Sequence, residues 1–590
     1  MDNPQNKRLP ARVKVLGTVF LLAQVLFAVN NYGPHQIPML NLVFDEPWIP
    51  VEVTFLQTGY PEVPDLFTFE DITEQSGLLA FKRAYVNSSN PSYLEVMGGG
   101  VAVGDVDGNG YEDLLFVSMP SFADPSDTSV SPLSLFKNLG DGTFQDITHE
   151  AGLGDIEGYA QGALFFDYNN NGRQDLYIAS YDGGQLFRND GGTFTDVTNE
   201  SGLYLNGLCG EFPCFGVAAT AADYNRNGYL DLYIINNVDW DIDNPAHYGE
   251  RQLFPAFFKA QHSFLFRNNG DGTFTNVTEE AGINNEGGKG LSAVWFDFNN
   301  NGWPDLYIAN DLTRNKLYLN RGDGTFTDVA ASARVNEVKS SMGVNVADFN
   351  GTGNLDLITT NLEGSYLSLF RNFGDLRFDY ATHYTGLNSS RRSSGWGVEF
   401  TDLNRNGYPD LVMAAGPVWD PDPIDAENLF FKNKGDGTFG EQTLSAGTFS
   451  NQHISRGLAV IDILNNNKPD IIISNIDGGH PQLLKNTTQN DNNWLKLLLE
   501  GTESNRDAVG ARVVVKRTDG MKILQEVKAG GSYQSSSSKA LFIGLDKYEA
   551  EEITIRWPAG HEQVLRDVSL NQVLNIKEQR SDLAGDLMKK

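Results

Sequence analysis

The sequence predicts an all-β protein, a seven-bladed β-propeller followed by a small C-terminal β-sandwich. A nine-residue acidic loop recurs seven times at intervals of about 60 residues, a length that fits a propeller blade of four strands. A Gly-Asp-Gly turn follows most copies and indicates a second hairpin in each unit. A strand-like segment near the N-terminus matches the piece that the last unit lacks.

Each acidic loop follows the pattern Asp-x-Asx-x-Asn-Gly-x-x-Asp, with some departures, and runs into an apolar segment. We number loops 1 to 7 by their first residues, which are Asp105, Asp167, Asp223, Asp297, Asp348, Asp402 and Asp462. Short carboxylates and amides around a glycine bend supply the six to eight oxygens that a hard cation prefers. We therefore expect Ca²⁺ as the cofactor, in about five to six of the loops.

The expected ligands are the side chains at loop positions 1, 3, 5 and 9 and the main-chain carbonyl at position 7. They are Asp105, Asp107, Asn109, Tyr111, Asp113, Asp167, Asn169, Asn171, Arg173, Asp175, Asp223, Asn225, Asn227, Tyr229, Asp231, Asp297, Asn299, Asn301, Trp303, Asp305, Asp348, Asn350, Thr352, Asn354, Asp356, Asp402, Asn404, Asn406, Tyr408 and Asp410. Loop 1 offers three carboxylates, whereas loops 2 to 4 and loop 6 offer two and should bind more weakly.

Two departures limit this assignment. Loop 7 has Leu464 where an oxygen is required and lacks the glycine, so it is not assigned as a site. Position 12 of loop 1 holds Phe116 rather than a bidentate Glu, so the loops are not EF-hands. The alternative to a metal site is an Asx-turn hairpin without metal, which the repetition of oxygen residues disfavours.

The segments around loop 1 predict four strands per blade, at residues 100–104, 114–117, 133–137 and 144–147. The last unit ends after Leu483-Leu-Lys-Asn without a fourth strand. Residues 67–73 (Phe-Thr-Phe-Glu-Asp-Ile-Thr) match the fourth strand of another unit at 194–198. We therefore expect this N-terminal strand to close a propeller that covers residues 67–489.

Antiparallel strand order places the acidic loops and the Gly-Asp-Gly turns on one rim of the propeller, and the other connections on the opposite rim. Most insertions fall on that opposite rim, the longest between residues 237 and 263. Grafted loops of this kind often carry binding residues. The candidate ligand-binding residues there are Trp240, His247, His262, Trp419, Asp420 and His480. The alternative is that the insertions are tolerated surface loops.

The composition restricts the possible partners. With 590 residues and a formal net charge of −32, the chain repels nucleic acid and anionic lipid headgroups. Its two cysteines, Cys209 and Cys214, lie close together in sequence, and a small disulfide-closed loop is expected in an oxidising compartment.

The N-terminus carries four cationic residues followed by an apolar run from Val15 to Val29. This pattern predicts a secretory signal peptide or an uncleaved membrane anchor over residues 1–30. Residues 31–66 are rich in proline and are interpreted as a spacer. The protein is thus expected to be periplasmic, extracellular or anchored on the outer face of a membrane, which it would contact through the N-terminal segment alone.

The C-terminal part, residues 490–577, predicts a small antiparallel β-sandwich packed on one side of the propeller, before a polar tail at 578–590. The expected strands are at residues 495–499, 511–516, 523–527, 541–543 and 553–557.

The repeats resemble the FG-GAP (VCBS) repeats of integrin α-chain propellers, which bind calcium in similar loops. Three C-terminal segments, Asp507-Ala-Val-Gly-Ala-Arg-Val, Gly530-Gly-Ser-Tyr-Gln-Ser and Ile555-Arg-Trp-Pro-Ala-Gly, resemble the ASPIC/UnbV domain. That domain follows FG-GAP repeats in the cartilage acidic protein family and its bacterial relatives, and the bacterial type fits best. The resemblance covers about residues 67–577 and implies an exported, calcium-binding protein with no generally assigned reaction. The EGF-like module of some animal members is not expected in these 590 residues, because they contain only two cysteines.

The function expected from these observations is a calcium-binding adhesion, binding or scaffold protein outside the cytoplasm, with an extracellular protein or glycan as ligand. The alternative is an enzyme, such as a polysaccharide lyase or hydrolase, that uses the rim with the insertions. Its candidate proton-transfer residues are Asp239, Asp241, His247, His262, Asp420, Asp422 and His480. No nucleophile–base motif occurs at a recognisable spacing, so no catalytic residue is assigned.

Overall fold

The computed structural model describes residues 67–83, 91–120, 130–205, 207–249, 254–418, 427–450, 453–478 and 480–580. These residues all belong to one unit, Pro64–Lys590. The predicted signal peptide or anchor (1–30), the spacer (31–66), almost all of the polar tail, and Trp419, Asp420 and Asp422 lie outside the described residues. Within them, no helix is both long enough and apolar enough to span a membrane.

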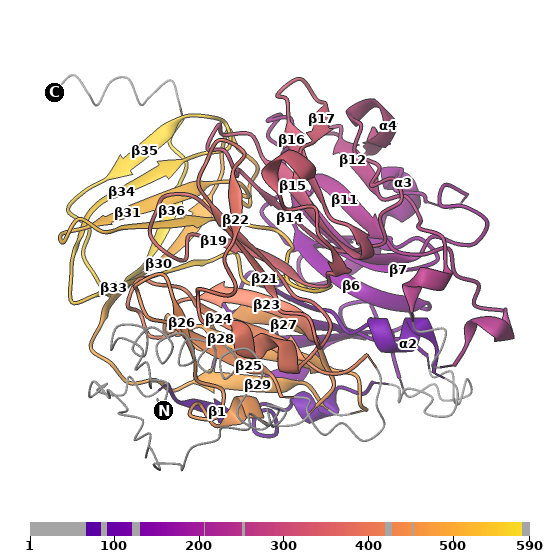
Figure 1. The fold of residues 1–590 in the computed structure, drawn as a ribbon, viewed down its shortest axis with the longest axis horizontal. Coiled ribbons are helices and arrows are strands. Elements are labelled where there is room, and N and C mark those ends of the chain that lie inside the picture. Colours follow the sequence, from indigo (N-terminus) through magenta and orange to yellow (C-terminus); the bar gives the residue numbers. More distant parts are fainter. Residues whose placement is uncertain are drawn as a thin grey trace, which may run out of the picture. The chain divides into compact units, whose positions relative to one another are not determined.

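The predicted all-β fold is confirmed, and most strands belong to four-stranded antiparallel sheets (Figure 1). In the first sheet β2 (Val101–Gly104), β3 (Asp113–Val117), β4 (Leu133–Asn138) and β5 (Phe144–Asp146) pair in chain order. Each acidic loop connects the first strand of a sheet to the second. Five more sheets repeat this order, with strands β6 (Tyr159–Phe166), β7 (Asp175–Tyr181), β8 (Gln185–Asn189), β9 (Phe194–Asp196), β10 (Gly216–Ala222), β11 (Asp231–Asn236), β12 (Phe264–Asn268), β13 (Phe274–Asn276), β14 (Gly290–Phe296), β15 (Asp305–Arg314), β16 (Lys316–Asn320), β17 (Phe326–Asp328), β19 (Val344–Ala347), β20 (Asp356–Thr359), β21 (Ser368–Asn372), β22 (Phe378–Tyr380), β23 (Gly395–Thr401), β24 (Asp410–Ala415), β25 (Leu429–Asn433) and β26 (Phe439–Glu441).

The helical elements are short and lie between strands. They are η1 (Leu78–Ala80), α2 (Tyr93–Met97), α3 (Thr198–Ser201), η2 (Pro245–His247), η4 (Pro255–Phe257), α4 (Thr278–Ala281), α5 (Ala330–Ala333), η5 (Asn388–Arg392) and η6 (Thr448–Ser450). One additional strand, β18 (Val338–Ser340), pairs with the long strand β15.

A seventh sheet joins the two ends of this series. Its strands β27 (Ser455–Ile461), β28 (Asp470–Asn475) and β29 (Gln482–Asn486) are followed in space by β1 (Phe69–Asp71). Phe69 lies opposite Asn486 in the antiparallel pair β1–β29. The first strands of neighbouring sheets also contact one another in a closed series, β2, β6, β10, β14, β19, β23, β27 and back to β2. In the described residues the seven sheets therefore form a ring.

An asparagine at the end of the third strand of each sheet connects that sheet to its neighbour. Asn268, for example, donates from Nδ2 to the carbonyl oxygen of Tyr168 in the preceding sheet (2.7 Å) and to that of Leu230 in its own sheet (3.0 Å). The equivalent residues in the other sheets are Asn138, Asn189, Asn320, Asn372, Asn433 and Asn486. Each donates to the carbonyl oxygen of the second residue in the acidic loop of the sheet before it in the ring. These amides thus form a ring of hydrogen bonds between sheets.

Substitution of one member of this ring is expected to destabilise the protein. Asn268→Ala removes the donors to two buried carbonyls and the acceptor of the Gly270 N–H, at a cost of about 1–3 kcal/mol. The free energy of unfolding, measured in denaturant, is the test. Asn269→Ala is the matched control, because the Asn269 side chain is exposed and bonds within its own turn, so an equal loss in both variants would contradict the role of the ring.

The C-terminal domain contains two further sheets. Their strands are β30 (Asn493–Glu500), β31 (Arg512–Arg517), β32 (Lys522–Glu526), β33 (Leu541–Asp546), β34 (Ala550–Arg556), β35 (Glu562–Leu565) and β36 (Gln572–Lys577). The sheet β33–β30–β36 is mixed, since β30 and β36 run parallel, so the expectation of a wholly antiparallel sandwich is wrong. Neither β35 nor β36 was predicted, because half of the residues in each short segment are polar and the chain between them covers only six residues.

One segment of the C-terminal domain fills the centre of the ring. We call residues 527–539, between β32 and β33, the plug segment. Its hydrogen bonds reach the first strand of each of the seven sheets; the partners include Val101, Ala163, Ala221, Ser292, Val344, Val398 and Val460. Gly100 permits this close approach, since a Cβ there would lie 2.1 Å from the carbonyl oxygen of Gln534.

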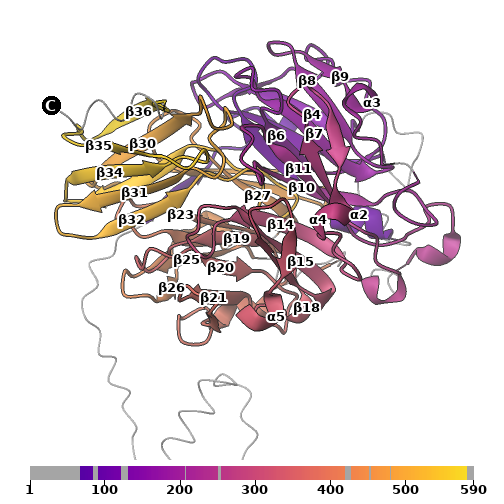
Figure 2. The same ribbon diagram turned by 90° about the horizontal axis from the view of Figure 1, so that it is seen from above.

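The plug segment extends through the ring to helix α2. The Tyr533 hydroxyl donates to the carbonyl oxygen of Met97 (2.7 Å), and the side chain is fully buried. The Tyr533 ring packs edge-on against Trp396 at 5.0 Å, and Trp396 in turn stacks on the guanidinium of Arg456. Helix α2 lies on the opposite side of the propeller sheets from β31, β34 and β35 in both views (Figures 1 and 2). The segment therefore connects the C-terminal domain to the far end of the ring.

Candidate metal centre

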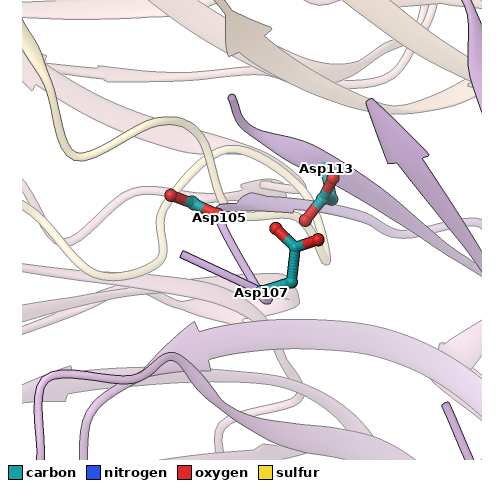
Figure 3. Close-up of side chains that lie close together, drawn as sticks. All are labelled: Asp105, Asp107 and Asp113. Atoms are coloured by element: carbon teal, nitrogen blue, oxygen red, sulfur yellow. The ribbon is translucent and has the colours of Figure 1, made fainter. Parts of the chain in front are cut away.

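Loop 1 brings three carboxylates together at the start of the first sheet. Oxygens of Asp105, Asp107 and Asp113 all lie within 4.8 Å of one another, in a group that could hold a metal ion (Figure 3). The backbone N–H groups of Gly108 and Gly110 donate to the two oxygens of Asp105, each at 2.8 Å. These bonds fold the loop back on its first residue, so the side chains at positions 1, 3 and 9 converge.

The ninth residue of the loop is an anchor as well as a candidate ligand. Asp113 is fully buried and accepts N–H bonds from Val106 (2.9 Å) and from Asn138 on β4 (2.8 Å). Burial raises the pKa of the Asp113 carboxyl to about 7, and raises that of Asp105 as well. A bound cation would offset this cost of burial, because it stabilises the charged form of both groups.

The same hydrogen-bond pattern recurs in the other loops. In loop 2, Asp167 accepts N–H bonds from Asn171 (3.0 Å) and Gly172 (2.6 Å), and loops 3 to 6 repeat this with their own residues at positions 5 and 6. In loop 5 the amide of Asn350, at position 3, is buried and has no hydrogen-bond partner in the protein. An all-oxygen set of converging side chains fits calcium better than zinc or copper.

The C-terminal domain lies over the rim that carries the acidic loops. Asp507 accepts the N–H of Asp167 in loop 2 (2.9 Å), and Arg517 donates to the carbonyl of Asn406 in loop 6 (3.0 Å). Both Arg512 and Arg556 form ion pairs with Asp297 in loop 4. The sequence predicted that this domain packs on one side of the propeller, but the rim was not predicted, because isolated arginines show no pairing pattern.

A cleft lies between loop 1 and the C-terminal domain. The cleft has a volume of 550 Å³ and is lined by loop 1 together with residues of β30 and β36. Asp105 and Glu112 contribute acidic groups, and Arg506 and Lys577 contribute basic ones. The loop with three carboxylates is therefore accessible from this cleft.

The predicted ligand rim is only partly exposed. Trp240 is fully buried and packs against Tyr181 and Tyr248, with centroids 5.9 and 5.6 Å away, so it belongs to the core of the insertion. Its burial could not be predicted because Tyr181 comes from β7 of a neighbouring sheet. His247 accepts the N–H of Asp241 at Nδ1 (3.1 Å) and holds the insertion together. By contrast, His262 and His480 are exposed.

Two of the enzymatic candidates on this rim, Asp239 and Asp241, accept hydrogen bonds within the protein. Asp239 accepts an N–H from Phe212 (3.2 Å) and a bond from Gln261, next to the segment closed by the disulfide between Cys209 and Cys214. Asp241 accepts the N–H of Asp243 (3.0 Å). One acid–base contact that was not predicted joins His453 and Asp477 at 3.0 Å. Sequence gave no sign of it, since the two residues are 24 positions apart in ordinary strand-flanking segments.

Comparison with known proteins identifies both parts of the chain. An FG-GAP-like repeat model matches residues 105–178, 167–234, 258–308, 297–359 and 348–413, and an ASPIC and UnbV model matches residues 501–583. Cartilage acidic protein 1 of Xenopus tropicalis is 25% identical over 73% of this chain and 66% of its own length. The human protein is 25% identical over 73% and 65%. The chain thus spans slightly less than two thirds of the length of these relatives.

Solved structures share parts of the architecture at low similarity. A lectin of Agrocybe aegerita that recognises non-reducing terminal N-acetylglucosamine is 19% identical, with a TM-score of 0.39 over 65% of this chain and 86% of the lectin. A rhamnogalacturonan lyase of Bacillus licheniformis is 12% identical, with a TM-score of 0.38 over 75% and 78%. Neither likeness indicates a function. The repeats and the C-terminal match together show that the chain is an FG-GAP-repeat protein with a C-terminal ASPIC/UnbV domain.

Proposed function

We propose that this protein is an exported binding or scaffold protein whose propeller and C-terminal domain are held together by calcium in the acidic loops. The observation that carries this proposal is the convergence of Asp105, Asp107 and Asp113 in loop 1, together with the recurrence in loops 2 to 6 of the backbone N–H bonds to the first aspartate. The ion supplies positive charge among buried carboxylates. The loops themselves bind and orient it through side chains that their backbone N–H bonds hold in place.

The position of the C-terminal domain supports a ligand site on the opposite rim. That domain covers the side with the acidic loops, and the plug segment fills the centre of the ring, so the rim with the insertions remains for a partner. Phe254 and Phe257 of the longest insertion are 50% and 68% exposed. Exposed aromatic side chains of this kind contribute strongly to contacts with proteins and with sugars. The proposed ligand is an extracellular protein or a glycan.

Export is supported by two features of the chain. The cationic and apolar N-terminal segment has the pattern of a signal peptide or an anchor. The bond between Cys209 and Cys214 fits an oxidising compartment.

A count of bound calcium tests this function. The full chain is expected to hold five to six ions after equilibrium dialysis, and Asp105→Asn is expected to hold one fewer because it loses a carboxylate and an N–H acceptor of loop 1. Metal content is measured by mass spectrometry after dialysis against buffered calcium. Asp155→Asn, at an exposed position outside the loops, is the matched control. A metal-free wild-type protein would refute the proposal.

A further inference from the structure

Loop 7 departs from the other loops at several positions. Position 3 holds Leu464, whose side chain packs against the apolar core of the first and last sheets, and position 6 holds Asn467 in place of glycine. Asn467 nevertheless adopts the left-handed backbone conformation, with φ 58°. The loop keeps the shape of the others, since Asp462 accepts N–H bonds from Asn466 and Asn467, both at 2.9 Å. It has lost an oxygen that a calcium site requires, so its residues do not fit the metal.

A lysine of the C-terminal domain contacts the first aspartate of this loop. The Lys496 ammonium on β30 lies 2.9 Å from Asp462 Oδ2 and 2.9 Å from Asn465 Oδ1. The side chains of Lys496 and Asp462 are 2% and 0% exposed. A buried carboxylate is costly unless a cation and hydrogen bonds accompany it, and Lys496 provides both.

Loop 4 provides the contrast. Arg512 and Arg556 also reach its first aspartate from the C-terminal domain, yet loop 4 keeps oxygen-bearing side chains at positions 1, 3, 5 and 9. Loop 4 therefore combines contacts from arginine side chains with all the candidate side-chain ligands of a metal site. Loop 7 has the contact from a lysine side chain but lacks one of those ligands.

We propose that Lys496 neutralises loop 7 in place of a metal ion, so that this loop is independent of calcium and fastens the closing sheet to the C-terminal domain. The contrast with the other loops rests on the proposed function, in which loops 1 to 6 bind calcium. Loop 7 connects β27 to β28, in the same sheet as β1 and β29, where the N-terminal strand joins the ring. The contact with Lys496 thus stabilises the ring where its two ends meet.

Thermal unfolding of the full chain tests this inference. Lys496→Met keeps the apolar stem and removes the ammonium, and it is expected to lower the melting temperature by several degrees, equally in saturating calcium and in excess chelator. Lys516→Met is the matched control, because Lys516 forms an exposed ion pair with Glu551 in the same domain, and no shift is expected. A loss that added calcium abolishes, or no loss at all, would overturn the inference.

Calcium counting keeps the inference testable if Lys496→Met does not fold. Asp462→Asn is expected to hold as many calcium ions as the wild type, whereas Asp105→Asn loses one. One ion fewer in Asp462→Asn would refute the metal-free role of loop 7. No ion lost in Asp105→Asn would instead refute the proposed function, so the two failures are distinguishable. The double variant Lys496→Met/Asp462→Asn is expected to regain part of the stability lost in Lys496→Met, since it no longer buries an unpaired charge.

Discussion

Chelation of calcium is expected to lower the melting temperature of the full chain by roughly 10 °C or more. An ion that binds the folded state alone stabilises it by about 2.7 kcal/mol when its free concentration is 100 times the dissociation constant. The proposed function places five or six such sites on one structure. The loops also contact the C-terminal domain, for example where Asp507 accepts the N–H of Asp167, so metal loss should loosen both domains.

Differential scanning calorimetry with stepwise calcium addition measures this effect. The melting temperature should rise with calcium concentration, as mass action requires, and magnesium at the same concentration should act less, since it demands a smaller and more regular site. The absence of a shift, together with no bound metal, would mean that the loops are Asx-turn hairpins and would contradict the calcium proposal.

Truncation of Tyr533 is expected to be the most destabilising single substitution in the plug segment. Tyr533→Ala removes a fully buried ring that packs on Trp396 and lies at the far end of the channel through the ring. Large-to-small changes of buried aromatic residues cost about 3–5 kcal/mol, because they lose transfer free energy and leave a cavity. Unfolding in denaturant measures the loss, and protease digestion should cut the variant faster.

Tyr533→Phe separates packing from hydrogen bonding. It keeps the ring and loses the bond to the Met97 carbonyl, so a smaller cost of about 1 kcal/mol is expected. Equal losses in the two variants would contradict the packing role, and near-wild-type stability of Tyr533→Ala would show that the plug segment is not needed for the fold.

The repeated part of the fold was predictable because its rules are local. Gly-Asp-Gly turns and alternating Asx residues select their backbone conformations within a few residues, and the apolar strands that flank an acidic loop, such as β2 and β3, are buried along their whole length. The pairing of β1 with β29 was predicted because residues 67–73 match the fourth strand of another unit, at residues 194–198. The candidate ligands in each loop follow from the same spacing, and in loop 1 the three carboxylates lie together.

The remaining features depend on contacts between distant segments. Gly530-Gly-Ser-Tyr was noticed as a family motif, but nothing in its composition shows that Ser535 bonds to Val101, 434 residues earlier. Trp240 was assigned to the rim because it lies in the longest insertion, whereas its ring packs against Tyr181 of the neighbouring sheet and against Phe215, which precedes β10. The seven asparagines recur visibly in the sequence. Their hydrogen bonds between sheets could not be predicted, because they depend on how closely neighbouring sheets lie.

The plug segment has a consequence for biosynthesis. A nascent chain that has emerged up to residue 489 contains all seven sheets, yet the N–H groups of Val103 and Val344 on the inner strands lack the plug-segment carbonyls that accept from them in the folded protein. Backbone groups left unpaired in an apolar ring are costly and invite association with other strands. The sheets that are synthesised first can therefore complete their hydrogen bonds only after the plug segment, near the end of the chain, has been synthesised. Folding of the propeller thus depends on the C-terminal domain.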